Sequence, residues 1–158
     1  MNKTKDVTLP LRLLCLDIDG TLLDTAHQLP PENRAAVQYA AAKGVCICLL
    51  SARPPQAIAP IAQALGVPGP IASFGGALIA EGEKRIFDRR LPVDAVQTVI
   101  RLAQQQGVSL SLYRDTDWFV EREDRWSEGE GLITGLHPMV VTLEDTLAAG
   151  APHKLLCM

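Results

Sequence analysis

The sequence lacks the features that mark membrane, secreted and nucleic-acid-binding proteins. None of its apolar runs approaches the roughly 18 residues of a membrane-spanning helix. A formal net charge of −3 leaves no basic excess for binding nucleic acid or an anionic membrane surface. Arg12 interrupts the short apolar segment near the start, which argues against a signal peptide. These absences predict a cytoplasmic protein whose partners are neither nucleic acids nor membranes.

Cysteine is scarce as well, and its placement argues against a disulfide framework. The four cysteines lie in short apolar, strand-like runs, and no pair has a metal-ligand spacing apart from Cys46 and Cys48, whose side chains alternate with Ile47. Such positions are typical of buried, reduced thiols. We expect that state for all four, Cys15, Cys46, Cys48 and Cys157.

Two common phosphate-binding fingerprints are also missing. The sequence contains neither the P-loop pattern nor the glycine pattern of dinucleotide-binding folds, which disfavours both classes. The three histidines, His27, His137 and His153, are scattered, and their spacing indicates neither a metal site nor a catalytic dyad.

What the sequence does contain is an alternation of apolar strands and helices. With 158 residues and an apolar fraction of 47%, the chain can form one domain or two small ones. Apolar runs at 11–16, 45–50 and 71–74 alternate with helix-forming segments at 32–43 and 54–65. This order predicts an α/β fold with parallel strands and right-handed crossovers. Pro60 should kink or break the second helix.

The pattern changes after a predicted hairpin of residues 77–80 and 84–88. Residues 93–106 form an amphipathic helical pattern that ends at Gly107. A second hairpin is predicted at 108–113 and 118–120, followed by a charged, solvated loop at 121–130 that Trp126 anchors. Strands at 139–143 and 154–158, with a short helix at 144–149, complete a separate α+β unit.

The strongest chemical signal follows the first strand, where Asp17, Asp19, Gly20 and Thr21 lie within five positions. Ligands of parallel sheets bind at the carboxyl ends of strands. Acids at i and i+2 can turn toward one point, and they repel each other unless a cation or a reacting group lies between them. The alternative is an ordinary turn with two solvated acids, but a turn does not account for the buried strand before it.

These residues suit phosphoryl transfer, which needs positioning and charge neutralisation. Asp17 can attack phosphorus as a nucleophile, and Asp19 can act as the general acid and base. Two neighbouring carboxylates predict a Mg²⁺ site at Asp17 and Asp19. The backbone amides of residues 18–21 can surround the phosphoryl oxygens.

Two later strand ends supply further candidates for binding substrate. The Ser51 hydroxyl, followed by Ala52 and Arg53, can bind a phosphoryl oxygen, or Ser51 can be the N-cap of the next helix. Arg53 can contact substrate or be a solvated loop cation. Gly75 and Gly76 follow the third strand, where glycine allows either a close approach to a ligand or simply a tight turn.

The run 17–22 resembles motif I of the haloacid dehalogenase superfamily of aspartate-nucleophile phosphatases, and later features resemble its Cof-type branch. Ala52 replaces the glycine that often follows the family's motif II serine, and Gly75 replaces a frequent asparagine. The resemblance implies an incomplete, Rossmann-like parallel-sheet core at 1–88 and an inserted α+β cap domain of the C2 type at 89–158. It also implies that the Asp17 side chain and the Asp19 backbone carbonyl hold the Mg²⁺.

The resemblance further leads us to expect a lysine and a Gly-Asp segment that the sequence does not contain after Met158. Lys154 falls on a predicted cap strand, so it is not assigned that lysine's role. The main hypothesis is a Mg²⁺-dependent hydrolase of a small phosphorylated metabolite, with the 158-residue chain alone weakly active or inactive. The alternative is a non-catalytic fragment or remnant that binds phosphate or a partner, and a phosphomutase is a third, weaker candidate. Either way, an open edge at the Asp17 strand, flanked by Leu14 and Leu16, predicts self-association.

Overall fold

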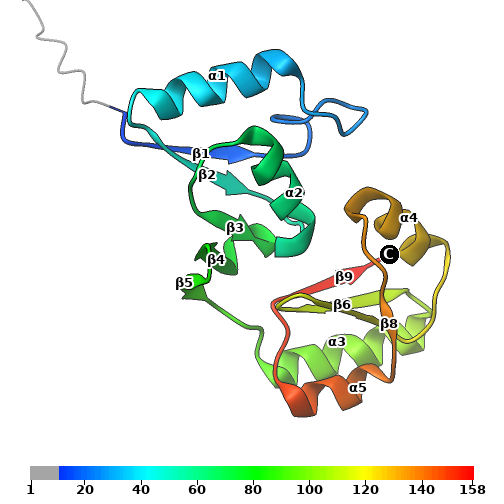
Figure 1. Cartoon of the computed structure of the whole chain (residues 1–158). Helices are drawn as coiled ribbons and strands as arrows, with labels where there is room; N and C mark the ends of the chain where they lie inside the picture. The colour runs from blue at the N-terminus through cyan, green and yellow to red at the C-terminus, as the bar shows by residue number, and fades with distance from the viewer. Residues whose placement is uncertain (1–10) are drawn as a thin grey trace, which may run out of the picture.

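The computed structural model describes residues 11–158, which form two sheets joined by a linker at residues 89–92 (Figure 1). The first sheet has the strand order β1-β2-β3-β4-β5. Strands β1 to β3 are parallel, and β4 and β5 form an antiparallel hairpin beside them. The elements of this part are β1 (Leu13–Asp17), α1 (Pro31–Ala42), β2 (Cys46–Leu50), α2 (Pro55–Leu65), β3 (Ile71–Ser73), the 3₁₀ turn η1 (Phe74–Gly76), β4 (Leu78–Glu81) and β5 (Lys84–Asp88). The predicted α/β fold with parallel strands is confirmed.

Helices α1 and α2 cover one face of the first sheet (Figure 1). Ile47 and Leu49 point to this face from β2, and they pack against Val37 of α1 and Ile58 of α2. The sequence predicts a kink or a break at Pro60, and helix α2 runs through this residue without a break. Pro60 is exposed, and its missing N–H releases only the carbonyl of Gln56 in the first turn of the helix.

The opposite face of the first sheet is thinly covered, which corrects the expectation of buried cysteines. Leu13, Cys15 and Cys46 are exposed there, because side chains alternate along each strand and both helices lie on the other face. Cys157 is exposed on the last strand of the second sheet, and only Cys48 is buried. Leu14 and Leu16 are half-buried, and they line an open groove of about 250 Å³ beside Val37.

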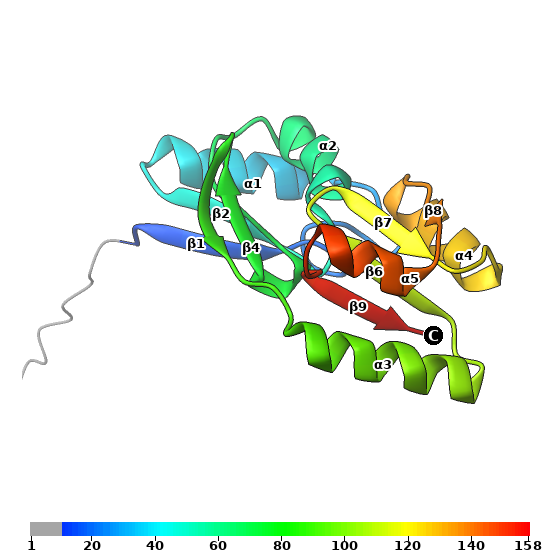
Figure 2. The ribbon, with the colours of Figure 1, turned by 90° about the horizontal axis from the view of Figure 1, so that it is seen from below.

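The second sheet has the strand order β8-β7-β6-β9. Helices α3 and α5 lie together on one of its faces, while α4 lies on the other side (Figures 1 and 2). The elements are α3 (Val93–Gln106), β6 (Leu110–Arg114), β7 (Asp117–Val120), α4 (Arg125–Thr134), β8 (Met139–Val140), α5 (Leu143–Thr146), the 3₁₀ turn η2 (Leu147–Ala149) and β9 (Lys154–Cys157). Strand β9 pairs with β6, so the last strand belongs to this sheet, as predicted.

One apolar cluster joins the two parts of the structure. Phe74 and Leu78 of the first part pack with Tyr113, Trp118 and Val120 from the second sheet. Along β6 and β7, the side chains of Tyr113, Trp118 and Val120 alternate with those that face α3. The face of the second sheet opposite α3 is therefore turned toward the loops at the ends of β2 and β3.

The segment predicted as a loop at 121–130 instead enters helix α4. Asp124 caps the helix, since its carboxylate accepts from the backbone N–H groups of Trp126 and Ser127 in a capping box. Gly129 and Gly131 inside the helix lower its intrinsic propensity and conceal it in the sequence. Trp126 is 42% exposed and does not anchor the segment.

The exposed edge strand leads to the first prediction. Strand β1 is the edge strand of the first sheet in the described residues, and its Leu13 is 51% exposed. Bare strand edges and apolar sheet faces pair with other chains, so we expect the protein to self-associate at micromolar concentration. Leu13→Lys should shift it toward the monomer in light scattering. Leu132→Lys, at an 89% exposed position on α4, is the matched control and should leave the association unchanged. A stable wild-type monomer of 17.1 kDa would contradict the prediction.

Candidate active site

The ends of the three parallel strands bring the predicted site residues to one edge of the first sheet. In the pairing register, Asp17 lies opposite Leu50 and Leu50 lies opposite Ala72, so β1, β2 and β3 end at nearly the same level. Asp19, Ser51 and Gly75 follow in the three loops beyond these ends. The register therefore places the three loops at the same edge of the sheet.

Backbone hydrogen bonds tie the second loop to the third. Gly75 N–H donates to the Ser51 carbonyl (2.9 Å), and Phe74 N–H donates to the Arg53 carbonyl (3.1 Å). Ser51 is buried, and its hydroxyl accepts a hydrogen bond from Arg53 N–H (3.1 Å). The N-cap of α2 is Pro54. Ser51 therefore shapes the loop and is not the helix N-cap that the sequence left open.

Arg53 and Asp19 form the strongest polar contact of the site. The Arg53 guanidinium donates to both carboxylate oxygens of Asp19, from Nε (2.9 Å) and Nη2 (2.6 Å). His27 Nδ1 lies 3.3 Å from the same carboxylate. Arg53 is buried and so is not a solvated loop cation. These hydrogen bonds, chiefly those from Arg53, hold the pKa of Asp19 below its ordinary value, so its carboxylate is ionised at neutral pH.

Asp17 offers a free carboxylate at the same edge. Its side chain is exposed and forms no hydrogen bond within residues 11–158, and no backbone N–H of these residues donates to the Asp19 carbonyl. An oxygen of the Asp17 carboxylate and the carbonyl oxygen of Asp19 suit Mg²⁺. This ion takes few protein ligands and fills its other positions with water and phosphate oxygens. The Asp19 carboxylate fits a metal less well, because Arg53 occupies both of its oxygens.

The glycines of the site adopt the left-handed backbone conformation. Gly20 (φ +75°) turns the chain after Asp19, while Gly75 (φ +66°) and Gly76 (φ +96°) turn it after β3. A Cβ at Gly75 would meet no atom within 4 Å, so an asparagine, which tolerates this conformation, would fit there. Thr21 is exposed, and its N–H is directed at the Ile18 carbonyl (3.4 Å), which leaves that amide poorly placed for a phosphoryl oxygen.

The second sheet and α4 reach into the site by contacts that the sequence did not indicate. Arg53 Nη1 donates to the Ile133 carbonyl at the end of α4 (2.9 Å), and Lys154 Nζ of β9 donates to the Ala52 carbonyl (3.0 Å). Gln56 in α2 donates to the Thr116 carbonyl between β6 and β7. Each pair is 60 or more residues apart in sequence, and local patterns carry no signal for such contacts.

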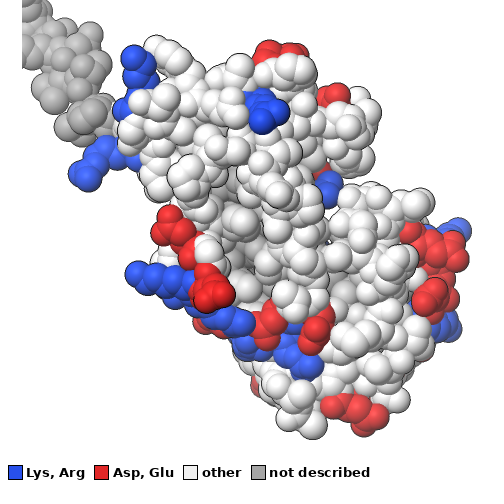
Figure 3. Space-filling view, viewed as in Figure 1, with Lys and Arg blue, Asp and Glu red and all other residues white. Residues whose placement is uncertain are grey.

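A charged network surrounds the linker between the two parts. Asp88, Asp115 and His153 offer ligand atoms within 4.8 Å of one another, an arrangement that could hold a metal ion. Both carboxylates are already paired with Arg85 and Arg90. Figure 3 shows basic and acidic side chains side by side around β5 and the linker. These residues therefore form an ion-pair network that connects the two parts of the structure across the linker.

His153 connects this network to the second sheet as a neutral ring. Its Nδ1 accepts from Asp115 N–H (3.1 Å), so Nε2 carries the proton and donates to Asp88 (3.0 Å). The ring stacks on Phe74, with the centroids 5.2 Å apart. Burial lowers the pKa of His153 against the opposing effect of Asp88.

This lowered pKa predicts a pH-dependent stability. As pH falls below about 6.5, the unfolded chain takes up a proton at His153 before the folded chain does, so stability decreases. The pKa values of Asp88 and Asp115 are also lowered, so their contribution to the stability of the fold is lost only near and below pH 4. His153→Gln should cost about 1–2 kcal/mol at pH 8 through lost hydrogen bonds. It should also flatten the fall in melting temperature between pH 8 and 5.5. His137→Gln is the exposed control, and an unchanged pH profile in His153→Gln would contradict the assignment.

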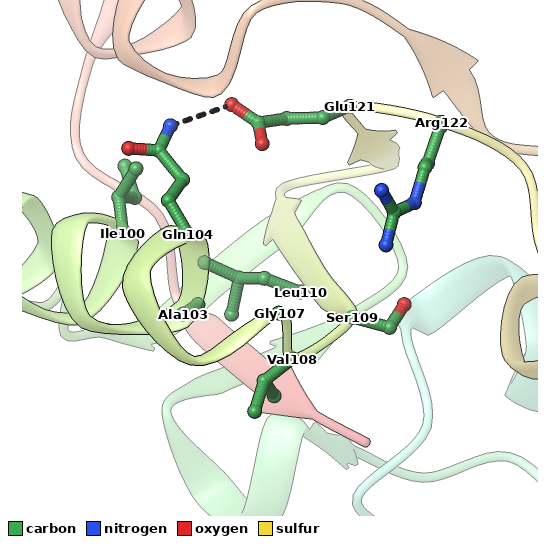
Figure 4. Close-up of a pocket in the computed structure, with 9 residues that line it drawn as sticks. All are labelled: Ile100, Ala103, Gln104, Gly107, Val108, Ser109, Leu110, Glu121 and Arg122. Atoms are coloured by element: carbon green, nitrogen blue, oxygen red, sulfur yellow. Dashed lines mark hydrogen bonds between the residues drawn. The ribbon is translucent and has the colours of Figure 1, made fainter.

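A partly open cavity lies away from this edge, in the second part of the structure. It has a volume of about 360 Å³ and is lined by residues of α3 and the start of β6, with Glu121 and Arg122 (Figure 4). Gln104 donates to Glu121 across it (3.0 Å). None of the predicted site residues lines this cavity.

Comparisons with known proteins agree with the fold. The sequence signature of haloacid dehalogenase-like hydrolases matches residues 14–146. An HMP-PP phosphatase from Yersinia pestis is 29% identical over 144 residues, which cover 90% of this chain and 52% of that protein. A haloacid dehalogenase-like hydrolase from Bacteroides thetaiotaomicron has a similar structure (TM-score 0.77, 23% identity, 87% of this chain and 54% of that chain). A sugar phosphatase of haloacid dehalogenase subclass IIB is similar as well (TM-score 0.75, 19% identity, 89% and 56%). The chain spans about half the length of the curated relatives it matches.

Within residues 11–158, none of the helices combines the length and the apolar character needed to cross a membrane.

Proposed function

Because the chain belongs to the haloacid dehalogenase-like hydrolase family, we propose that it acts in the cytoplasm in the Mg²⁺-dependent hydrolysis of a small phosphorylated metabolite through an aspartyl-phosphate intermediate. The observation that carries the proposal is the contrast between two neighbouring acids. Asp17 presents a free, exposed carboxylate at the strand end, while Asp19 is held by Arg53. The phosphatase names of the relatives favour this function over a non-catalytic fragment or remnant.

The two acids have different tasks in this proposal. An oxygen of Asp17 attacks phosphorus, and the bond from phosphorus to the leaving oxygen breaks, which leaves an acyl phosphate on Asp17. Asp19 gives a proton to the leaving oxygen and then takes one from the water that attacks the acyl phosphate. The Asp17 carboxylate and the Asp19 carbonyl would hold the Mg²⁺, which would supply positive charge for the transfer of the phosphoryl group.

Arg53 sets the protonation state of Asp19 in this scheme. While Arg53 binds Asp19, the carboxylate is ionised and cannot serve as an acid. A phosphoryl group has oxygens that compete for the same guanidinium. Binding of substrate therefore frees Asp19 from Arg53 and lets its pKa rise, so that it can carry the proton. Once the leaving group has departed with this proton, Arg53 binds Asp19 again, and the ionised carboxylate acts as the base in the second step.

We propose that residues 89–158 act as a cap over this site and residues 1–88 as the core. The contacts of Arg53 with Ile133 and of Lys154 with Ala52 support this division, because both join the second part directly to the loop after β2. A cap of this kind excludes water during the reaction.

The function is tested by trapping the intermediate on the repurified protein. With Mg²⁺ and an aryl phosphate, we expect an acyl phosphate that hydroxylamine releases, and EDTA should prevent its formation. Because the trap reports only the first half of the reaction, it succeeds even where turnover by the 158-residue chain is low. Phosphate binding without an acyl phosphate would support the non-catalytic alternative instead.

A further inference from the structure

Lys154 is a cation with an unusual position next to the proposed active site. It is the first residue of β9 and lies opposite Tyr113 in the pairing with β6. Its Nζ lies 5.0 Å from the centre of the Tyr113 ring and donates to the Ala52 carbonyl (3.0 Å). The second sheet thus places an ammonium group on the backbone of the loop that follows β2.

The ammonium group of Lys154 is incompletely paired. Within residues 11–158 it forms no ion pair with any carboxylate. Glu130, the acid whose charge acts on it, accepts its hydrogen bond from the Tyr113 hydroxyl (3.1 Å). An ammonium group has three donors, and one of them is used by Ala52. Partial burial lowers the pKa of Lys154, as expected for a desolvated cation.

Lys154 is also within reach of the reacting groups. Lys154 contacts Ala52, which lies between Ser51 and Arg53 in the chain. Arg53 contacts Asp19. Ser51 follows Leu50, the residue opposite Asp17 in the sheet. Consecutive Cα atoms are about 3.8 Å apart, so one small molecule can span these positions. Ala52 is exposed, and its side chain is only a methyl group.

We propose that Lys154 binds a second anionic group of the substrate, a carboxylate or a further phosphate on the leaving-group side. This inference rests on the proposed function, since it assumes that one phosphoryl group lies at Asp17. It makes Lys154 a specificity-determining residue that selects phosphorylated metabolites with an additional negative charge. Burial of the cation makes this pairing stronger than it would be at an exposed lysine.

The test measures binding to the Mg²⁺-loaded protein by calorimetry, with probes that differ in one charge. One pair is 3-phosphoglycerate and glycerol 3-phosphate, which tests the carboxylate. The other pair is fructose 1,6-bisphosphate and fructose 6-phosphate, which tests the second phosphate. The wild type should prefer the more charged member of at least one pair by about tenfold, the effect of one charge-assisted hydrogen bond.

Lys154→Met should remove this preference while the affinity for inorganic phosphate stays the same, and Lys154→Arg should retain most of it. Lys43→Met is the matched control, since Lys43 also lies over a tyrosine ring, that of Tyr39 (5.3 Å), but on an exposed helix end. A loss of affinity for all probes alike in Lys154→Met, or equal binding of both members of both pairs by the wild type, overturns the inference. If inorganic phosphate itself does not bind the wild type, the proposed function fails and the inference fails with it.

Discussion

Replacing Asp17 with asparagine is expected to abolish the acyl phosphate. The amide nitrogen and oxygen of asparagine keep the shape of the side chain but provide no anionic nucleophile, so no bond to phosphorus forms. Loss of a nucleophile lowers turnover by roughly 10⁴-fold or more. The side chain is exposed and unpaired within the described residues, so the substitution removes no contact on which the fold depends.

The measurement compares hydroxylamine-released acyl phosphate and aryl phosphate hydrolysis in the wild type and in Asp17→Asn. Asp145→Asn is a suitable control, because Asp145 is an exposed acid on α5, far along the chain from the strand ends. Melting temperatures should agree within a few degrees among the three proteins. Acyl phosphate formed by Asp17→Asn at the wild-type rate would reject Asp17 as the nucleophile.

The features of the site that the sequence predicted are local ones. A short apolar strand followed directly by Asp17 and Asp19 places both acids at a strand end whatever the rest of the chain does. The alternation of strands and helices likewise predicts parallel pairing, and the register then aligns Ser51 with the end of β1. These conclusions need only the periodicity of side chains and the handedness of crossovers.

The features that the sequence did not predict depend on distant residues. The contacts between Asp19 and Arg53 and between Ala52 and Lys154 join positions 34 and 102 residues apart. The sequence did not indicate the hydrogen bonds of His153, because its partners, Asp88 and Asp115, come from other elements. Burial was mispredicted for three of the four cysteines, because an apolar strand does not show how many of its faces are covered.

The pairing of Arg53 with Asp19 makes the second large prediction specific. Asp19→Asn should slow overall turnover by roughly 10² to 10⁴, the range for a general acid–base group. With an aryl phosphate whose leaving group needs no proton, the first step should continue and the second should fail, because asparagine cannot take a proton from the attacking water. Acyl phosphate on Asp17 should therefore accumulate in Asp19→Asn, whereas Asp17→Asn forms none.

The pairing of Arg53 with Asp19 also predicts how the breakdown of the acyl phosphate depends on pH. In the wild type, Arg53 lowers the pKa of Asp19, so Asp19 stays ionised, and able to act as a base, to a lower pH than an ordinary aspartate. Arg53→Met removes the two hydrogen bonds to Asp19, so the pKa of Asp19 should rise toward its ordinary value. The acid limb of acyl-phosphate breakdown should then move to higher pH in Arg53→Met and disappear in Asp19→Asn. Breakdown in Asp19→Asn at the wild-type rate, with the wild-type pH profile, would show that another group activates the water and that Arg53 holds Asp19 for a structural reason alone.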